Sequence, residues 1–168
     1  NNGPRFINEI ARKKNGTTNI DGIYSVSWIE PRSPQDPCCG TLKIIPDNVY
    51  FMIPSSILVS IVTPTLNQCG FIEETIRSVI SQDYPRIEYL IMDGGSTDGT
   101  LEILSRYEDQ LRWVSESDEG QSAAINKGWR LTQGEIVAYL NSDDLYLPST
   151  IHHIVEFFHA HPEVDVVY

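Results

Sequence analysis

Apolar and polar positions follow two different periods along the chain from residue 57 onward. Short runs rich in β-branched residues predict strands, and between them apolar residues recur three and four positions apart, as in amphipathic helices. The predicted strands cover residues 57–63, 87–92, 111–114, 135–140 and 164–168. The predicted helices cover residues 71–81, 100–107, 122–131 and 149–160. Strands that alternate with helices through short connections predict an α/β fold, with an open, mostly parallel sheet flanked by helices.

The first 54 residues differ from the rest of the chain. They are rich in Asn, Gly, Pro and Ser, and the prolines between Pro31 and Pro54 interrupt any long element. We expect a short helix over residues 6–14 and a short strand over residues 23–29. The sequence thus predicts an N-terminal extension of unknown role, residues 1–54, followed by an α/β domain, residues 55–168.

Composition narrows the possible functions. A chain of 168 residues with 40% hydrophobic content can bury one core, and its net charge of −11 argues against a nucleic-acid surface, which needs clustered Lys and Arg. Three cysteines, Cys38, Cys39 and Cys69, are too few for a disulfide framework. No apolar run approaches the ~20 residues that span a bilayer. We therefore expect a cytoplasmic protein with reduced thiols.

Two adjacent carboxylates follow the apolar strand at 135–140. Asp143 and Asp144 stand just past its end, where open α/β sheets bind their ligands. Neighbouring carboxylates repel each other unless a cation or a proton intervenes, and Mg²⁺ or Mn²⁺ commonly joins one or two carboxylates to substrate phosphates. The pair predicts a metal-assisted diphosphate site. The alternative is an acidic turn that caps the helix starting near Pro148.

Three further polar segments follow or precede predicted elements, at residues 63–70, 93–99 and 117–128. In the second, Thr97 or Asp98 could cap the next helix, whereas Asp93 is not needed for a cap, so we expect Asp93 to accept hydrogen bonds from a ligand. In the third, Lys127 could lie near a diphosphate, although a solvated Lys is the commoner outcome.

Taken together, four motifs resemble the nucleotide-binding half of family 2 glycosyltransferases, which have the GT-A fold. The motifs are Ser-Ile-Val-Thr-Pro-Thr-Leu-Asn at 60–67, Met-Asp-Gly-Gly-Ser-Thr-Asp-Gly-Thr at 92–100, Asp-Glu-Gly-Gln-Ser-Ala-Ala-Ile-Asn-Lys-Gly at 118–128 and Asn-Ser-Asp-Asp at 141–144. Their order and spacing fit the family over about residues 57–168. The resemblance indicates that residues 57–168 form the nucleotide-sugar-binding part of such a domain, up to and including the half that contains the DXD motif.

The resemblance implies transfer of a sugar from a nucleotide-diphosphate-sugar donor, with a UDP-sugar favoured, to an acceptor hydroxyl with inversion at the anomeric carbon. It implies Mn²⁺ or Mg²⁺ held by Asp143, with Asp144 as a second ligand candidate. Donor-binding residues carried over from the motifs are Thr63, Pro64, Thr65, Asn67, Asp93, Gly94, Asp118, Gly120, Asn126, Lys127 and Ser142. The catalytic base is expected beyond Tyr168.

The family further suggests a role in cell-surface polysaccharide or glycan synthesis, with a glycan, lipid-linked or small-molecule acceptor. It also allows peripheral membrane contact through regions outside this sequence. Three positions depart from the common pattern: Asn141 replaces the first Asp of DXD, Gly94 replaces a second Asp that contacts the base, and Leu66 replaces an aromatic residue.

Two other functions compete with this interpretation. A sugar-nucleotide pyrophosphorylase has a similar fold, but its first loop is Gly-rich with an Arg, whereas residues 63–70 hold one Gly and no Arg. An acidic receiver-like or scaffold domain would bind Mg²⁺ through Asp143 and Asp144 without transferring sugar. Affinity for a nucleotide would separate a glycosyltransferase from such a scaffold.

Overall fold

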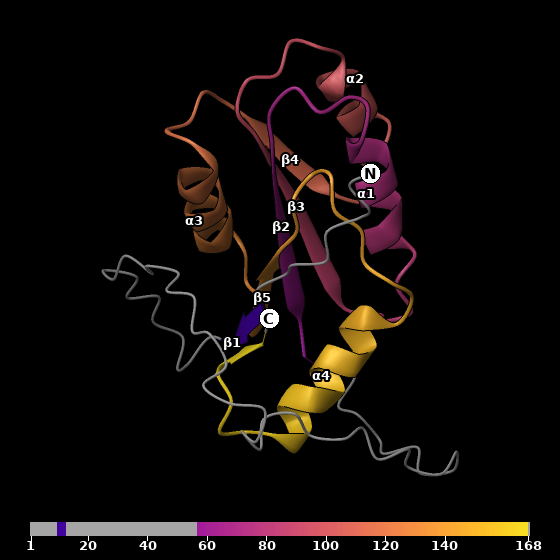
Figure 1. The fold of residues 1–168 in the computed structure, drawn as a ribbon, viewed down its shortest axis with the longest axis vertical. Helices are drawn as coiled ribbons and strands as arrows, with labels where there is room; N and C mark the ends of the chain where they lie inside the picture. The colour runs from indigo at the N-terminus through magenta and orange to yellow at the C-terminus, as the bar shows by residue number, and fades with distance from the viewer. Residues whose placement is uncertain (1–9, 13–56, 168) are drawn as a thin grey trace, which may run out of the picture.

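One six-stranded sheet forms the centre of the computed structural model, which describes residues 10–12 and 57–167 (Figure 1). The strand order is β4-β3-β2-β5-β1-β6. The strands are β1 (Ile10–Arg12), β2 (Val59–Thr65), β3 (Ile87–Asp93), β4 (Arg112–Ser115), β5 (Ile136–Tyr139) and β6 (Val166–Val167). Strands β2 to β5 run parallel, whereas β1 runs antiparallel to both of its neighbours. The predicted mostly parallel sheet is confirmed.

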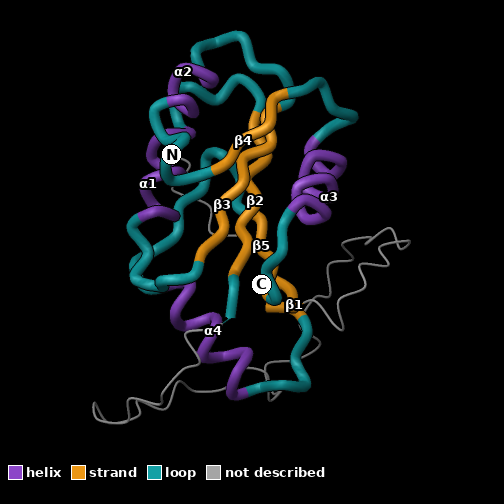
Figure 2. The backbone as a smooth tube through the Cα atoms, turned by 180° about the vertical axis from the view of Figure 1, so that it is seen from behind, coloured by secondary structure: helices purple, strands orange, loops and turns teal. Residues whose placement is uncertain are grey.

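Four helices cover the two faces of this sheet. They are α1 (Ile72–Ile80), α2 (Thr100–Ser105), α3 (Gln121–Leu131) and α4 (Thr150–Ala160). Helix α3 lies on one face and α1 and α2 lie on the other, as the front and back views both show (Figures 1 and 2). Every helix and strand predicted from residue 57 onward is present, with ends that differ by at most two residues within the described part.

The prediction for residues 6–14 was wrong. Instead of a helix, residues 10–12 form β1, which pairs with β5 from Ile10 opposite Ala138 to Arg12 opposite Ile136, and with β6 on its other side. A short isolated helix is only marginally stable in water, whereas a strand here satisfies backbone groups of two neighbouring strands. The strand predicted over residues 23–29 lies outside the described residues.

Alternation along the central strands divides the core between the two faces. In β2, Val59 and Ile61 face the larger cluster under α1, α2 and α4, while Val62 faces the smaller cluster under α3. In β3, Ile91 joins the larger cluster, and Leu90 and Met92 the smaller one. A strand buried on both faces has no polar alternation, which is why β2 and β3 read as nearly continuous apolar runs.

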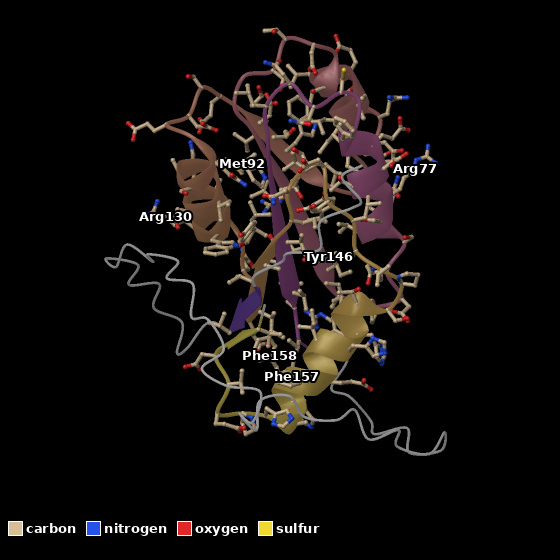
Figure 3. All side chains as sticks on the ribbon, viewed as in Figure 1. Arg77, Met92, Arg130, Tyr146, Phe157 and Phe158 are labelled. Atoms are coloured by element: carbon tan, nitrogen blue, oxygen red, sulfur yellow. The ribbon has the colours of Figure 1, made fainter. Side chains whose placement is uncertain are left out.

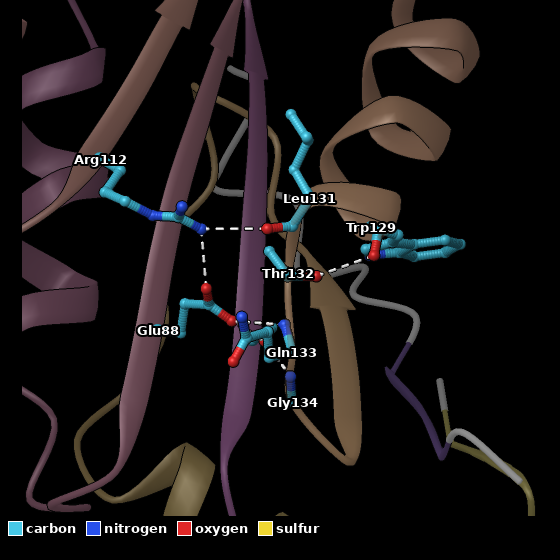
Figure 4. A network of polar contacts seen from close by, with 8 residues as sticks. Glu88, Arg112, Trp129, Leu131, Thr132, Gln133 and Gly134 are labelled. Carbon is cyan, nitrogen blue, oxygen red and sulfur yellow. Dashed lines mark hydrogen bonds and ion pairs between the residues drawn. The ribbon is translucent and has the colours of Figure 1, made fainter. Parts of the chain in front are cut away.

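A polar network at the opposite end of the sheet from the Asp143 loop joins β2, β3, β4 and the turn after α3 (Figure 4). The Glu88 carboxylate accepts hydrogen bonds from Arg112 Nη2 at 2.7 Å, from Ser60 Oγ at 2.6 Å and from Gln133 N at 2.8 Å. Gly134 N donates to Ser60 Oγ at 2.8 Å. One carboxylate thus connects three strands and fixes the path of the chain from α3 into β5.

Candidate functional site

The carboxyl ends of the parallel strands lie level with one another. Thr65 at the end of β2 pairs with Asp93 at the end of β3, which pairs with Ser115 at the end of β4. On the other side of β2, Val62 pairs with Tyr139 of β5. Thr65 and Ser142 each stand three residues further along the sequence, so they also lie near each other. The polar segments selected from the sequence therefore meet at one edge of the sheet, as parallel topology requires.

A cavity of about 300 Å³ opens at this edge. Residues of four segments line it: Pro64, Thr65, Leu66, Gln68, Asp118, Gln121, Asn141, Ser142 and Asp143. They come from the end of β2 and the loop after it, from the loop after β5, from the loop before α3, and from the first residue of α3. Its polar lining and two carboxylates, Asp118 and Asp143, suit a polar ligand that brings a cation with it.

The two adjacent carboxylates have different surroundings. Asp143 is exposed and lines the cavity, whereas Asp144 is 7% exposed and accepts a hydrogen bond from Asn141 Nδ2 at 2.9 Å. The backbone N–H of Asp144 also donates to Asn141 O at 3.1 Å, which closes a tight turn. Asp143 thus faces the cavity, while Asp144 is bonded within the turn.

Asp93 is the organising centre of three loops. It is 1% exposed, and its Oδ2 accepts hydrogen bonds from Gly95 N and Ser96 N, each at 3.0 Å, and from Ser115 Oγ at 2.6 Å. Ser96 Oγ donates to its other oxygen, Oδ1. The Asp93 backbone carbonyl accepts from Glu116 N at 2.9 Å. These bonds within the chain occupy a carboxylate that the sequence pattern assigned to a ligand.

The loops after β2 and β3 are joined along their whole length. Gly94 N donates to Thr65 O at 2.9 Å, Asn67 N to Ser96 Oγ at 2.7 Å, and Thr97 N to Asn67 Oδ1 at 2.9 Å. Asn67 adopts a left-handed conformation, with φ of 52°, that Asn tolerates better than most residues. Asn67 is thus positioned by its neighbours to support the cavity wall rather than to line it.

Asp98 completes this connection at the start of α2. Its Oδ1 accepts hydrogen bonds from Thr100 Oγ1 at 2.6 Å and Thr100 N at 3.0 Å, and its Oδ2 accepts from Cys69 N at 3.0 Å. These donors, the Thr100 hydroxyl first, hold the pKa of Asp98 well below its ordinary value. The prediction that Thr97 or Asp98 caps this helix was wrong: the N-cap residue is Gly99, without a side-chain cap bond, and Asp98 binds Thr100 from one residue before the cap.

Gly94 lies directly beneath the Asp118 side chain. A Cβ atom at position 94 would come within 3.1 Å of Asp118 Oδ2 and 3.5 Å of Leu66 Cδ1. An Asp at this position would add a second carboxylate against Asp118 in a space that is already filled. The glycine at 94 and the leucine at 66, both departures from the common family pattern, therefore form one packed arrangement with Asp118.

A second cavity of about 190 Å³ lies on the α3 side of Asp118. Its lining comprises Met92, Asp93, Glu116, Ser117, Asp118, Glu119, Ala123, Ala124 and Lys127. Lys127 Nζ forms an ion pair with Glu116 Oε1 here. Figure 3 places Met92 between α3 and the sheet, consistent with the burial of its side chain. Lys127 does not line the larger cavity, where Asp143 lies.

The predicted donor-binding residues fall into three groups, of which Asp118 belongs to two. Pro64, Thr65, Asp118 and Ser142 line the larger cavity, and Asp93, Asp118 and Lys127 line the smaller one. The others line neither: Thr63, Asn67, Gly94, Gly120 and Asn126. Thr63 is fully buried, with its hydroxyl 3.0 Å from that of Tyr89. The role of each in donor binding stays a prediction.

Four cavity residues were absent from the predicted donor set: Leu66, Gln68, Gln121 and Asn141. Gln68 and Gln121 stand in polar segments that the sequence already singled out, so the signal for them was present. Leu66 and Asn141 were noted only as departures from a pattern. The amides are also connected, since Gln121 Nε2 donates to Asn141 Oδ1 across the cavity mouth.

Metal ligands are sparse around Asp143. Within residues 10–12 and 57–167, no three His, Cys, Asp or Glu side chains gather as a group that could hold an ion. A single exposed carboxylate fits a hard divalent cation whose remaining ligands are diphosphate oxygens and water, as Mg²⁺ and Mn²⁺ often have in nucleotide sites.

In the same described residues, no helix is long and apolar enough to cross a membrane.

Comparison with known proteins identifies the family. The family described as glycosyl transferase family 2 matches residues 60–168, well over half of the chain. The chain belongs to glycosyltransferase family 2. This membership confirms the resemblance of the four motifs and favours a glycosyltransferase over a pyrophosphorylase or a receiver-like scaffold.

Individual relatives agree in sequence and fold. TuaG of Bacillus subtilis, a glycosyltransferase named for teichuronic acid biosynthesis, is 40% identical over 104 residues, which are 60% of this chain and 41% of TuaG. The structure of S. aureus TarS with UDP-GlcNAc covers 63% of this chain at a TM-score of 0.60 and 28% identity. The mannosyltransferase PcManGT of Pyrobaculum calidifontis, with GDP-Man and Mn²⁺, covers 61% at a TM-score of 0.57 and 32% identity.

These similarities establish the GT-A fold, and they also show how much of each relative the chain covers. The chain spans 41% of the length of TuaG and 32% of each of the two solved enzyme chains. The matched region holds the four motifs and the larger cavity, so the comparisons concern the part of the domain that these residues build.

Proposed function

We propose that this chain forms the donor-binding part of a metal-dependent, inverting glycosyltransferase. The supporting observation is the cavity at the carboxyl ends of the parallel strands, with the exposed Asp143 carboxylate in its wall. Membership of family 2 supports a nucleotide-diphosphate-sugar donor, and the two solved relatives were captured with such donors, UDP-GlcNAc and GDP-Man.

Charge in the cavity supports the metal. Asp118 and Asp143 both line it, and the chain carries a net charge of −11, so a diphosphate would meet repulsion without a cation. Asp143 would hold Mn²⁺ or Mg²⁺, and a bound divalent cation would offset charge that develops on the leaving nucleoside diphosphate. Asp144, buried in the turn, would keep Asp143 in place.

The remaining cavity residues would orient the donor. Thr65 and Ser142, both small and polar, would lie beside the ribose and diphosphate, and Asp118 would accept hydrogen bonds from sugar hydroxyls. Transfer to the acceptor hydroxyl from the opposite face of the sugar would invert the anomeric carbon, with a carboxylate base supplied from beyond residue 168. The name of TuaG supports cell-surface polysaccharide as the product class.

The proposal predicts metal-dependent binding of one nucleoside diphosphate. Thermal unfolding is measured with UDP, GDP, dTDP or ADP, each with Mn²⁺ or with EDTA. A ligand present at ~100 times its dissociation constant should stabilise the folded state by about 2.7 kcal/mol. We expect a shift with one nucleotide that EDTA removes, because the cation is needed to bring the diphosphate beside two carboxylates.

The matched variants are Asp143→Asn and Asp109→Asn. Both remove one exposed carboxylate, but Asp109 stands before β4, away from the cavity. Asp143→Asn should abolish the Mn²⁺-dependent shift, and Asp109→Asn should retain it. Equal shifts in unfolding temperature in the two variants would show that Asp143 does not hold the metal. If no nucleotide shifted the unfolding temperature of the unmodified protein, donor binding itself would be contradicted.

A further inference from the structure

Helix α1 presents a row of polar side chains to the segment that follows β5. Thr75, Ser78 and Gln82 are spaced three and four residues apart, so they share one face of the helix and its C-terminal end. In Figure 3 the labelled Tyr146 lies between α1 and the central strands. Thr75 is buried, and Ser78 and Gln82 are half-buried, on the side of α1 that faces the chain carrying Asp143.

The first member, Thr75, contacts the metal loop directly. Its side chain is fully buried, and its Oγ1 lies 2.9 Å from Ser142 O and 3.0 Å from Asp144 O. These two carbonyls are the backbone neighbours of Asp143 on either side. One hydroxyl proton is thus shared between two acceptors that flank the proposed metal ligand.

Ser78 and Gln82 extend this contact along the loop. Ser78 Oγ accepts a hydrogen bond from Tyr146 N at 3.2 Å and donates to Thr75 O at 2.8 Å. Gln82 Nε2 donates to Leu147 O at 2.8 Å, and its Oε1 accepts from Ile151 N at 3.2 Å. Backbone groups from residue 142 to the first turn of α4 are therefore bound to one face of α1.

The position of Asp143 depends on this backbone. Its carboxylate is exposed, so packing does not fix it, and its location is set by the loop on which it stands. A divalent cation requires its ligands to be placed within a few tenths of an ångström. A shift of the loop would therefore weaken cation binding even with the carboxylate intact.

We propose that Thr75 is a positioning residue for cation binding, acting through the carbonyls of Ser142 and Asp144 on Asp143. The proposal rests on the proposed function, in which Asp143 holds the cation. Ser78 supports the same loop one turn along the helix. Thr75 itself touches neither donor nor metal, since it is buried behind the loop and does not line the cavity.

The test is Thr75→Val, which keeps the side-chain shape and removes the hydroxyl. Mn²⁺ binding to the intact protein is followed by the electron paramagnetic resonance signal of the free ion, with the nucleoside diphosphate that stabilises the protein most. Loss of an outer partner of a metal ligand typically weakens metal binding 10–100-fold, so we expect at least a ~10-fold weaker Mn²⁺ affinity. Thr75→Ser should restore it.

Thr132→Val is the matched control. Thr132 is 6% exposed and its hydroxyl donates to Trp129 O at the end of α3, so the same chemical change is made far from the Asp143 loop. Both Val variants should lose some thermal stability, but only Thr75→Val should lose Mn²⁺ affinity. That contrast separates positioning from a general loss of a buried hydrogen bond.

Two results would overturn the proposal and leave the proposed function standing. One is unchanged Mn²⁺ affinity in Thr75→Val alongside its loss in Asp143→Asn. If Thr75→Val fails to fold, the other is unchanged affinity in Ser78→Ala, which releases the loop at Tyr146. If Asp143→Asn itself retains full Mn²⁺ affinity, the proposed metal site fails, and Thr75 loses its role with it.

Discussion

Carboxylates in this domain do different work according to the donors around them. Asp93 ends β3 and Asp98 stands in the loop that follows, and both accept several hydrogen bonds from the chain itself. Asp143 is exposed at the cavity instead. The residue type is identical in all three cases, and the local supply of N–H and O–H groups separates a carboxylate that the chain itself occupies from one that is exposed at the cavity.

Asp98 should make the stability of the domain sensitive to acid. Its folded-state pKa is depressed below the ordinary value of 3.8, so its contribution is complete above pH 3.8 and is lost as pH falls further. Asp98→Asn should therefore lower the unfolding temperature near neutral pH. Between pH 5 and pH 2, the unfolding temperature of the variant should then decrease by less than that of the unmodified protein. Thermal unfolding followed by circular dichroism across this pH series measures both.

The same variant offers an independent readout at Cys69. The neighbouring Asp98 carboxylate raises the pKa of the thiol of this exposed cysteine. Asp98→Asn should therefore increase the rate at which iodoacetamide modifies Cys69 near pH 8, as followed by peptide mass spectrometry. Parallel acid profiles and equal alkylation rates in the two proteins would show that Asp98 does not hold these loops together.

At the scale of elements, α3 approaches the sheet through a glycine. A Cβ atom on Gly128 would come within 2.5 Å of Val62 Cγ1 and 3.1 Å of Met92 Cγ. These side chains belong to the smaller core cluster, which also holds Ala124 from the same helix. The helix that begins at the cavity with Gln121 is therefore seated by small residues on its inner face.

Gly128→Ala should destabilise the domain although alanine favours helices. The substitution gains about 1 kcal/mol of helix propensity, but overpacking against Val62 typically costs about 1–3 kcal/mol and would push α3 outward. Urea unfolding should show a lower midpoint. The same change at Gly70, where a Cβ would meet nothing within 4 Å, should leave the midpoint within experimental error. A Gly128→Ala midpoint as high as that of Gly70→Ala would contradict the close packing.

At the scale of the whole molecule, residues 10–12 of the N-terminal segment contribute a strand to the sheet. Strand β1 stands between β5 and β6 and is bonded to both. The division at residue 54 stays a prediction. We propose that residues 10–12 form part of the domain that carries the site, since β5 leads directly into the Asp143 loop.

Ala11→Pro tests this proposal. Because β1 has a partner on each side, the Ala11 N–H faces a neighbouring strand in either direction, and proline removes it and disrupts the pairing. We expect a loss of about 1–3 kcal/mol in the free energy of unfolding, measured with urea. Ala11→Ser, which keeps the N–H, serves as the control. Equal stability of the two variants would show that β1 is dispensable to the domain.

The sequence determined the elements from residue 57 onward, the mostly parallel direction of the strands and the edge at which polar loops meet. Those features depend on local periodicity and on the rule that parallel strands end at one edge, so Asp118, Ser142 and Asp143 could be placed near one another in advance. The family motifs, read together, added the kind of ligand to expect.

Only the tertiary structure decided which polar side chains face the cavity. The bond of Ser115 to Asp93, the ion pair of Lys127 with Glu116 and the fit of Gly94 under Asp118 join residues 11 to 24 positions apart. The contact of Thr75 with the Asp143 loop spans 67 and 69 positions. Periodicity reports neighbours within one element, whereas the partner that saturates a carboxylate or fixes a loop is set by how elements pack in space.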